Sequence, residues 1–245
     1  MSLTATALLT ILALFKMPSH PRKPVQQRLP RTAGWGGSRT GAGRKPGARP
    51  SVPHRTRPAH RGCYPVHATL RAVPGLGALR DCPVFLALAA ALAAASSAAF
   101  RLIHYSVQHD HLHLIVEATD RAAFLRGMRG LAIRTARAVN RAAQRRGKVW
   151  AERYHARALR TPREVRAALV YVLQNWRKTV RGAQNLDPCA TGYWFDGWRG
   201  PRPAWSRPAP GEAPPVRAPR TWLLATGWRR LGLIGLEERP RVQTT

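Results

Sequence analysis

The chain has 245 residues, of which 41 are Lys or Arg and 11 are Asp or Glu, and its formal net charge is +30. This length allows one core of ordinary size or two small ones. So positive a charge indicates a polyanionic partner, nucleic acid before an anionic membrane surface. Its cysteines, Cys63, Cys82 and Cys189, are far apart, which argues against a disulfide framework or a zinc knuckle and favours a reducing cytoplasm.

Residues 1–62 are predicted to form a disordered basic arm. From residue 18 onward Pro, Gly, Arg and Lys dominate, and such a segment buries too little apolar surface to offset the entropy cost of ordering it. It could follow a phosphate backbone. The apolar residues 3–15 are too few to span a membrane, which needs roughly 20. Because Met17 follows them, we interpret residues 1–16 as an extension from a mis-called start.

A folded domain is predicted over residues 63–182. Three segments of β-type composition, bounded by turn residues, are expected to be strands: Tyr64–Val73, Arg101–Gln108 and His111–Ala118. His109 and Asp110, between the last two, suit a hairpin turn. The Ala-rich stretch Val84–Phe100 is predicted as a helix, since Ala has the highest helix propensity.

Two more helices complete the predicted domain. Residues 120–147 have one apolar face and an Arg-rich outer face, which a soluble surface and a DNA contact explain equally well. After a strand or extended piece at Val149–Leu159, the sequence "TPRE" predicts a helix start, with Thr161 as N-cap and Glu164 completing a capping box. The buried stripe of this helix is expected to be Val165, Leu169, Val172 and Trp176.

The remaining residues, 183–245, are predicted as a tail rich in Pro, Arg and Trp. Within it, Arg220–Leu236 has the pattern of a short amphipathic helix. The predicted order of elements, β-α-β-β-α followed by an extended piece and a helix, indicates an α+β fold with helices packed on one face of an antiparallel sheet.

Two histidines are the first candidates for chemistry. His111 and His113 are two positions apart in a predicted strand, so both side chains lie on the same face of the sheet. Two imidazoles can ligate one metal, and because a closed structural zinc site takes four ligands, an open site with a catalytic divalent cation fits better. Taken alone, such a pair is more often a pair of surface histidines.

The last predicted helix carries two further candidates, Tyr171 and Asn175. Four positions apart, they share one helical face and lie at the edge of the buried stripe. The Asn175 carbonyl oxygen suits Mg²⁺ or Mn²⁺, and the Tyr171 phenol can act as a nucleophile. The alternative for Tyr171 is a packing role, with its ring buried and its hydroxyl in water.

Several segments together resemble a known family. "HLHLIVEA" is similar to the strand motif of the HUH single-strand nucleases, and "YVLQNWRKT" resembles the catalytic helix of single-tyrosine HUH transposases. These are the insertion sequence 200-like enzymes and especially their REP-associated relatives. "PVHATLRAVPGLGALRD" and "GKVWAERYHARALRTPREV" resemble other segments of the family. The resemblance covers roughly residues 17 to 235, and it implies the HUH nuclease fold, with a ferredoxin-like antiparallel sheet.

The resemblance also implies an activity. Such a transposase binds hairpin-bearing single-stranded DNA and cuts it, leaving a 5′-phosphotyrosine and a free 3′-OH. Tyr171 would be the nucleophile, and His111, His113 and Asn175 would hold Mg²⁺ or Mn²⁺. The partner would be DNA at the bacterial nucleoid and not a membrane, and both a monomer and a homodimer remain open.

Other residues keep alternatives open. Asp110 stands where the family commonly has Asn, and Tyr154 is a competing nucleophile. His67 and His155 are expected to be structural or to contact DNA. A repurposed or decayed DNA-binding protein is the second functional hypothesis, and a basic membrane-surface protein is a weaker third. Six basic residues are candidates for DNA contact: Arg71, Arg129, Arg137, Arg153, Arg157 and Lys178.

Overall fold

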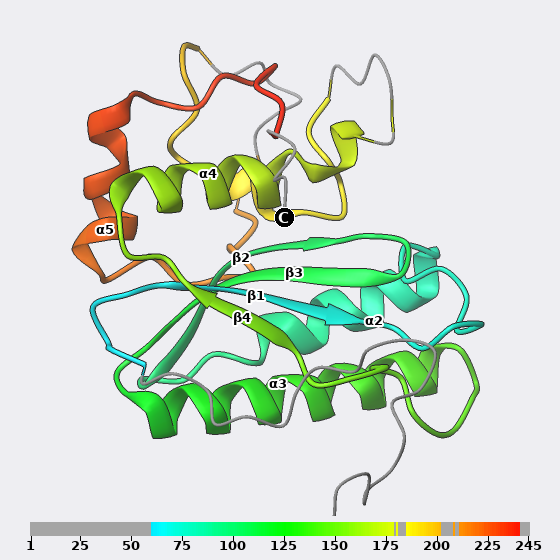
Figure 1. Ribbon diagram of the computed structural model, residues 1–245. Coiled ribbons are helices and arrows are strands. Elements are labelled where there is room, and N and C mark those ends of the chain that lie inside the picture. Colours follow the sequence, from blue (N-terminus) through cyan, green and yellow to red (C-terminus); the bar gives the residue numbers. More distant parts are fainter. Residues whose placement is uncertain (1–59, 179, 181–184, 202–207, 209–210, 241–245) are drawn as a thin grey trace, which may run out of the picture. The chain divides into compact units, whose positions relative to one another are not determined.

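The structure is a computed structural model, and it describes residues 60–178, 180, 185–201, 208 and 211–240 (Figure 1). Residues 1–59, which include almost all of the predicted basic arm, lie outside this range. Within the described residues, no helix has the length and apolar character needed to cross a membrane.

Four antiparallel strands form a sheet in the order β2-β3-β1-β4. Thr69 of β1 lies opposite His113 of β3, and this register places the first and third predicted strands side by side. The predicted hairpin turn is confirmed, because the backbone N–H of Gln108 donates to the carbonyl of His111 across His109 and Asp110 at 2.8 Å. The strands are β1 (Val66–Arg71), β2 (Phe100–Val107), β3 (His111–Ala118) and β4 (His155–Ala158).

Helices cover both faces of this sheet (Figure 1). Helices α2 (Cys82–Ala93) and α3 (Arg121–Ala142) pack on one face, and α4 (Pro162–Leu173) lies across the other. The predicted fold class, an α+β fold with an antiparallel sheet, is confirmed. The prediction that the helices pack on one face of the sheet is wrong, because α4 packs on the face opposite α2 and α3.

Strand alternation explains the two cores. Val66, Ala68, Leu112 and Leu114 point to α2 and α3 and belong to the first apolar cluster. Ile115, one position from Leu114, points the other way and joins the second cluster with the buried side of α4. Because neighbouring residues of a strand face opposite sides, β2 and β3 contribute to both cores, with Ile103 and Ile115 in the second.

The N-terminus of α4 forms as the sequence predicts. The backbone N–H of Glu164 donates to Oγ1 of Thr161, and the Glu164 carboxylate accepts from the backbone N–H of Thr161, so the capping box is complete. Val165, Leu169 and Val172 of the predicted stripe are buried, whereas Trp176 lies beyond the end of α4, in the 3-10 helix Asn175–Lys178, and is only partly buried. This start determines which face of α4 meets the sheet.

The predicted helix Val84–Phe100 is wrong at its end, since α2 stops at Ala93. Two serines that follow compete for the backbone: Ser96 Oγ accepts from the N–H of Leu102 and Ser97 Oγ from that of Phe100. Such side-chain bonds favour turns over helix. Because the helix has ended before these serines, Phe100 is the first residue of β2.

Three other boundaries also differ from the predictions. Helix α3 ends at Ala142 and not at residue 147, with Gln144 at a φ of 49°. Only His155–Ala158 of the extended piece forms a strand. The predicted helix Arg220–Leu236 is replaced by a four-residue helix α5 (Trp222–Ala225) and the 3-10 helix η4 (Gly227–Leu231). Gly232 ends the latter with a φ of 85°, a conformation that glycine adopts without strain.

Residues beyond 182, predicted as a tail, contribute to the second core. Leu223, Leu224, Trp228 and Ile234 are buried in the same apolar cluster as α4. The Glu117 carboxylate of β3 fixes this segment by accepting from the backbone N–H groups of Arg220 and Thr221, at 2.8 and 2.9 Å. Helix α4 is therefore held between the sheet and the C-terminal segment.

Candidate active site

On the α4-facing side of the sheet, four polar side chains of the two central strands lie close together. His67 and Thr69 alternate with core residues of β1, and His111 and His113 do the same on β3. The antiparallel register brings Thr69 directly opposite His113. The prediction that the two β3 histidines share a face is confirmed, and the structure adds a third imidazole beside them.

His113 is buried and held through one of its two ring nitrogens. Its Nδ1 lies 3.1 Å from Thr69 Oγ1 and 3.3 Å from His67 Nε2. Its Nε2 is also buried but has no hydrogen-bond partner. Burial, followed by the neighbouring His67, lowers the pKa of His113 to about 2, so the ring is neutral and one nitrogen is available as a ligand.

His111 lies next to His113 but is partly exposed. The two rings stand edge to face, with centroids 4.6 Å apart. His111 Nδ1 lies 2.6 Å from Asp110 Oδ1, and this hydrogen bond lowers the pKa of Asp110. A carboxylate on one nitrogen orients the ring and leaves the other nitrogen for a metal. Asp110, the departure from the family pattern, thus has a structural contact with a candidate ligand.

Tyr171, on the last turn of α4, closes this cluster from above the sheet. Its ring is edge-on to His113 with centroids 4.9 Å apart, and 5.6 Å from the ring of His67. The Lys178 ammonium lies 3.9 Å from the centroid of the Tyr171 ring. Burial raises the pKa of Tyr171 and lowers that of Lys178. The structure therefore brings Tyr171 and both predicted histidines together.

Asn175 does not keep the predicted relation to Tyr171. Helix α4 ends at Leu173, and Asn175 begins a 3-10 helix, η1 (Asn175–Lys178), after a Gln174 cap with φ of −117°. The two residues are therefore not one turn apart on a continuous α-helix. Asn175 is buried, and its side chain makes no hydrogen bond to another described residue.

The competing tyrosine lies elsewhere. The ring of Tyr154 is edge-on to Phe124 of α3, at a centroid distance of 5.9 Å, and it packs against the first apolar cluster. That cluster is on the opposite side of the sheet from the histidines. Tyr171 is therefore the tyrosine that the fold places beside His111 and His113.

The six candidate DNA contacts are divided between the two sides. Arg71 lies opposite His111 in the β1–β3 register, and Lys178 covers Tyr171. Arg129 and Arg137 are exposed on α3, across the sheet from the site. Of the two near β4, Arg153 is exposed and Arg157 pairs with Glu164 at 2.7 Å.

Sequence reasoning gave no site role to Thr69, and it expected His67 to be structural or to contact DNA. A signal was present in "VHATLR", where polar residues alternate with apolar ones as they do in β3. Their contact with His113 depended on the β1–β3 pairing and its register. A strand pattern predicts which residues share a face, but it does not predict which strand lies next to it.

The comparisons with known proteins bear on this site. Residues 88–175 match the family described as "Transposase IS200 like". The chain resembles the insertion sequence 200-like transposases. This confirms the resemblance predicted from the sequence, and the matched segment includes β2, β3, α3, β4 and α4. No curated protein matches the chain.

One solved structure similar to this chain is described as that of a REP-associated tyrosine transposase bound to a REP hairpin. It is 17% identical, with a TM-score of 0.47, and the match covers 57% of this chain and 82% of the other.

The residues present fit a divalent cation in part. Among the described residues, no three His, Cys, Asp or Glu side chains form a metal-binding group. However, His113 is neutral and its buried Nε2 has no partner, which is what a ligating histidine requires. His111 and His113 could thus supply two ligands, and further oxygen donors would have to come from an amide or from a bound phosphate.

Proposed function

We propose that this protein is a metal-dependent tyrosine transposase that cuts hairpin-bearing single-stranded DNA, with Tyr171 as its nucleophile. The observation that carries the proposal is the edge-on contact between Tyr171 and His113, with His111 beside them, inside the segment that matches the transposase family. A phenol next to two imidazoles suits covalent phosphoryl transfer.

The proposed reaction balances without an external energy source. The Tyr171 oxygen attacks the scissile phosphorus and its phenolic proton passes to water. The bond from phosphorus to the 3′ oxygen breaks, and that oxygen takes up a proton to become a free 3′-OH. The 5′-phosphate stays on Tyr171, so the phosphodiester energy is kept for strand joining.

Residues around Tyr171 assist this step. Burial raises the pKa of Tyr171, which opposes the charged phenolate, and the Lys178 ammonium over the ring favours the developing negative charge. We propose His111, His113 and the Asn175 amide oxygen as ligands of Mg²⁺ or Mn²⁺. When bound, the cation would supply Lewis-acid polarisation of the phosphate. Thr69 and His67 would keep the His113 ring in position.

The test is formation of a covalent adduct. The protein is mixed with labelled single-stranded hairpins from its own genomic flanks and Mg²⁺ or Mn²⁺, and the products are separated on a denaturing gel. We expect an adduct that disappears in Tyr171→Phe and persists in Tyr154→Phe, the matched control. An adduct that survives Tyr171→Phe would overturn the assignment. Hairpin binding without any adduct would favour the repurposed DNA-binding protein.

A further inference from the structure

A groove of about 660 Å³ lies between α4 and the C-terminal segment. One wall is formed by α4, with Arg163, Ala167 and Tyr171 at successive turns of the helix. The other wall comes from the C-terminal segment, with Leu231 and Arg239. Its volume lies within the range of ligand-binding clefts, about 300–1,000 Å³.

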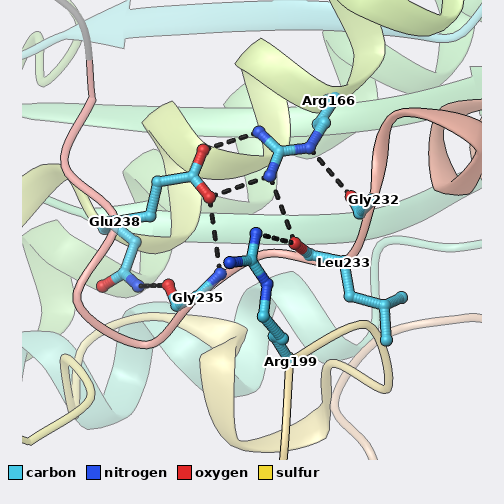
Figure 2. A network of polar contacts seen from close by, with 7 residues as sticks. Arg166, Arg199, Gly232, Leu233, Gly235 and Glu238 are labelled. Carbon is cyan, nitrogen blue, oxygen red and sulfur yellow. Dashed lines mark hydrogen bonds and ion pairs between the residues drawn. The ribbon is translucent and has the colours of Figure 1, made fainter.

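A charged clamp fixes the two walls relative to each other (Figure 2). Arg166 of α4 forms a bidentate ion pair with Glu238, with Nη1–Oε1 at 2.6 Å and Nη2–Oε2 at 2.8 Å. The same guanidinium donates to the carbonyls of Gly232 and Leu233. Arg166 is thus committed to the protein, and the groove exists before any ligand enters it.

Two other arginines of the groove are not engaged in such bonds. Arg163 and Arg239 are exposed and make no hydrogen bond or ion pair to another described residue. The groove is also lined by the apolar residues Ala167, Val170 and Leu231. Guanidinium groups match phosphate oxygens, and an apolar floor suits the faces of unpaired bases.

Tyr171 links this groove to the histidine cluster. It lines the groove, and its ring also contacts His113. A strand with its scissile phosphate at Tyr171 would therefore continue into the groove on one side of the cut. We propose that the groove binds the single-stranded nucleotides that flank the scissile phosphate, with Arg163 and Arg239 contacting their phosphates. This inference rests on the proposed function, since it takes Tyr171 as the nucleophile.

The test combines truncated DNA with single-charge variants. Hairpin oligonucleotides are shortened stepwise on each side of the cut, and binding is measured by fluorescence anisotropy in EDTA at several salt concentrations. Wild type is compared with Arg163→Gln, Arg239→Gln and Arg146→Gln, a control that removes the same charge from an exposed loop. Because binding is measured without cleavage, its outcome is separate from that of the adduct assay.

We expect each groove variant to lower the slope of log affinity against log salt by about 1 on the full-length oligonucleotide. On DNA lacking one flank, wild type should already have lost that affinity, and the groove variants should match it. Arg146→Gln should behave as wild type throughout. If the groove variants lose equal affinity on oligonucleotides of every length, or lose none, the groove assignment is overturned. The adduct assay would still test the role of Tyr171. An absent adduct with the expected flank dependence would instead overturn only the catalytic role.

Discussion

The two faces of the sheet are made by the same strands but have different tasks. On β3, Leu112, Leu114 and Val116 enter the core beneath α2 and α3, whereas His111 and His113 face α4. The first face carries the larger apolar cluster, and the second combines a smaller apolar cluster with buried polar groups. A strand whose alternate residues already form one complete core can carry costly buried histidines on its other face.

The largest expected effect is a loss of adduct formation when a histidine on the α4-facing side of the sheet is replaced. In His113→Ala, the unpartnered Nε2 and its contact with Tyr171 are both removed, so the rate of adduct formation should fall about 100-fold or more. The rate is measured per folded molecule, with the thermal midpoint recorded in parallel. A rate within a factor of about 3 of wild type would mean that His113 has no role in adduct formation.

On the face of the sheet covered by α2 and α3, a substitution should lower stability and leave adduct formation unchanged. Met128 of α3 is fully buried in the first core. Met128→Ala should lower the free energy of unfolding by about 2–5 kcal/mol, through lost burial and a residual cavity. Adduct formation per folded molecule should be unchanged. Urea unfolding and the gel assay together check this, and a changed rate at full folding would show coupling across the sheet.

Much of the polar face was predictable because it depends on local pattern. The β3 alternation gave the shared face of His111 and His113, and the Thr161–Glu164 capping box gave the start of α4 and hence the direction of Tyr171. The end of α4 was not predictable in this way. The chain leaves α-helix after Leu173, where buried Arg177 binds Gln174 and Glu237.

The structure of the C-terminal segment was also mispredicted, because it too depends on contacts between residues far apart in the sequence. Its pattern suggested a short amphipathic helix over Arg220–Leu236, but Gly232 interrupts it, and Trp228 and Ile234 reach the core from separate segments. The groove also depends on pairing between Arg166 and Glu238, which are 72 positions apart. Contacts between residues so distant in sequence leave no periodic signal in either segment.

A smaller effect is expected at the contact that joins β3 to the C-terminal segment. Glu117 is buried on the polar face and accepts from two backbone N–H groups and the Thr221 hydroxyl. Glu117→Gln keeps the shape but removes the charge, and should cost about 1–3 kcal/mol. We expect limited proteolysis to cut sooner within residues 211–240, whereas Met128→Ala destabilises the whole fold. Unchanged protease sensitivity would contradict this role.

The smallest expected effect is a pH dependence of the clamp. Arg166 lowers the pKa of Glu238 below its ordinary value of 4.5. The ionised carboxylate therefore contributes stability above about pH 4.5, and this contribution is lost as pH falls through the lowered pKa. Because the pair is partly exposed, we expect less than about 1 kcal/mol. Urea unfolding at several pH values should give a shallower acid loss in Glu238→Gln than in wild type. An identical slope in both proteins would mean that the Arg166–Glu238 ion pair does not contribute to holding the groove wall, which would then depend on its apolar contacts and on the Arg166 bonds to the carbonyls of Gly232 and Leu233.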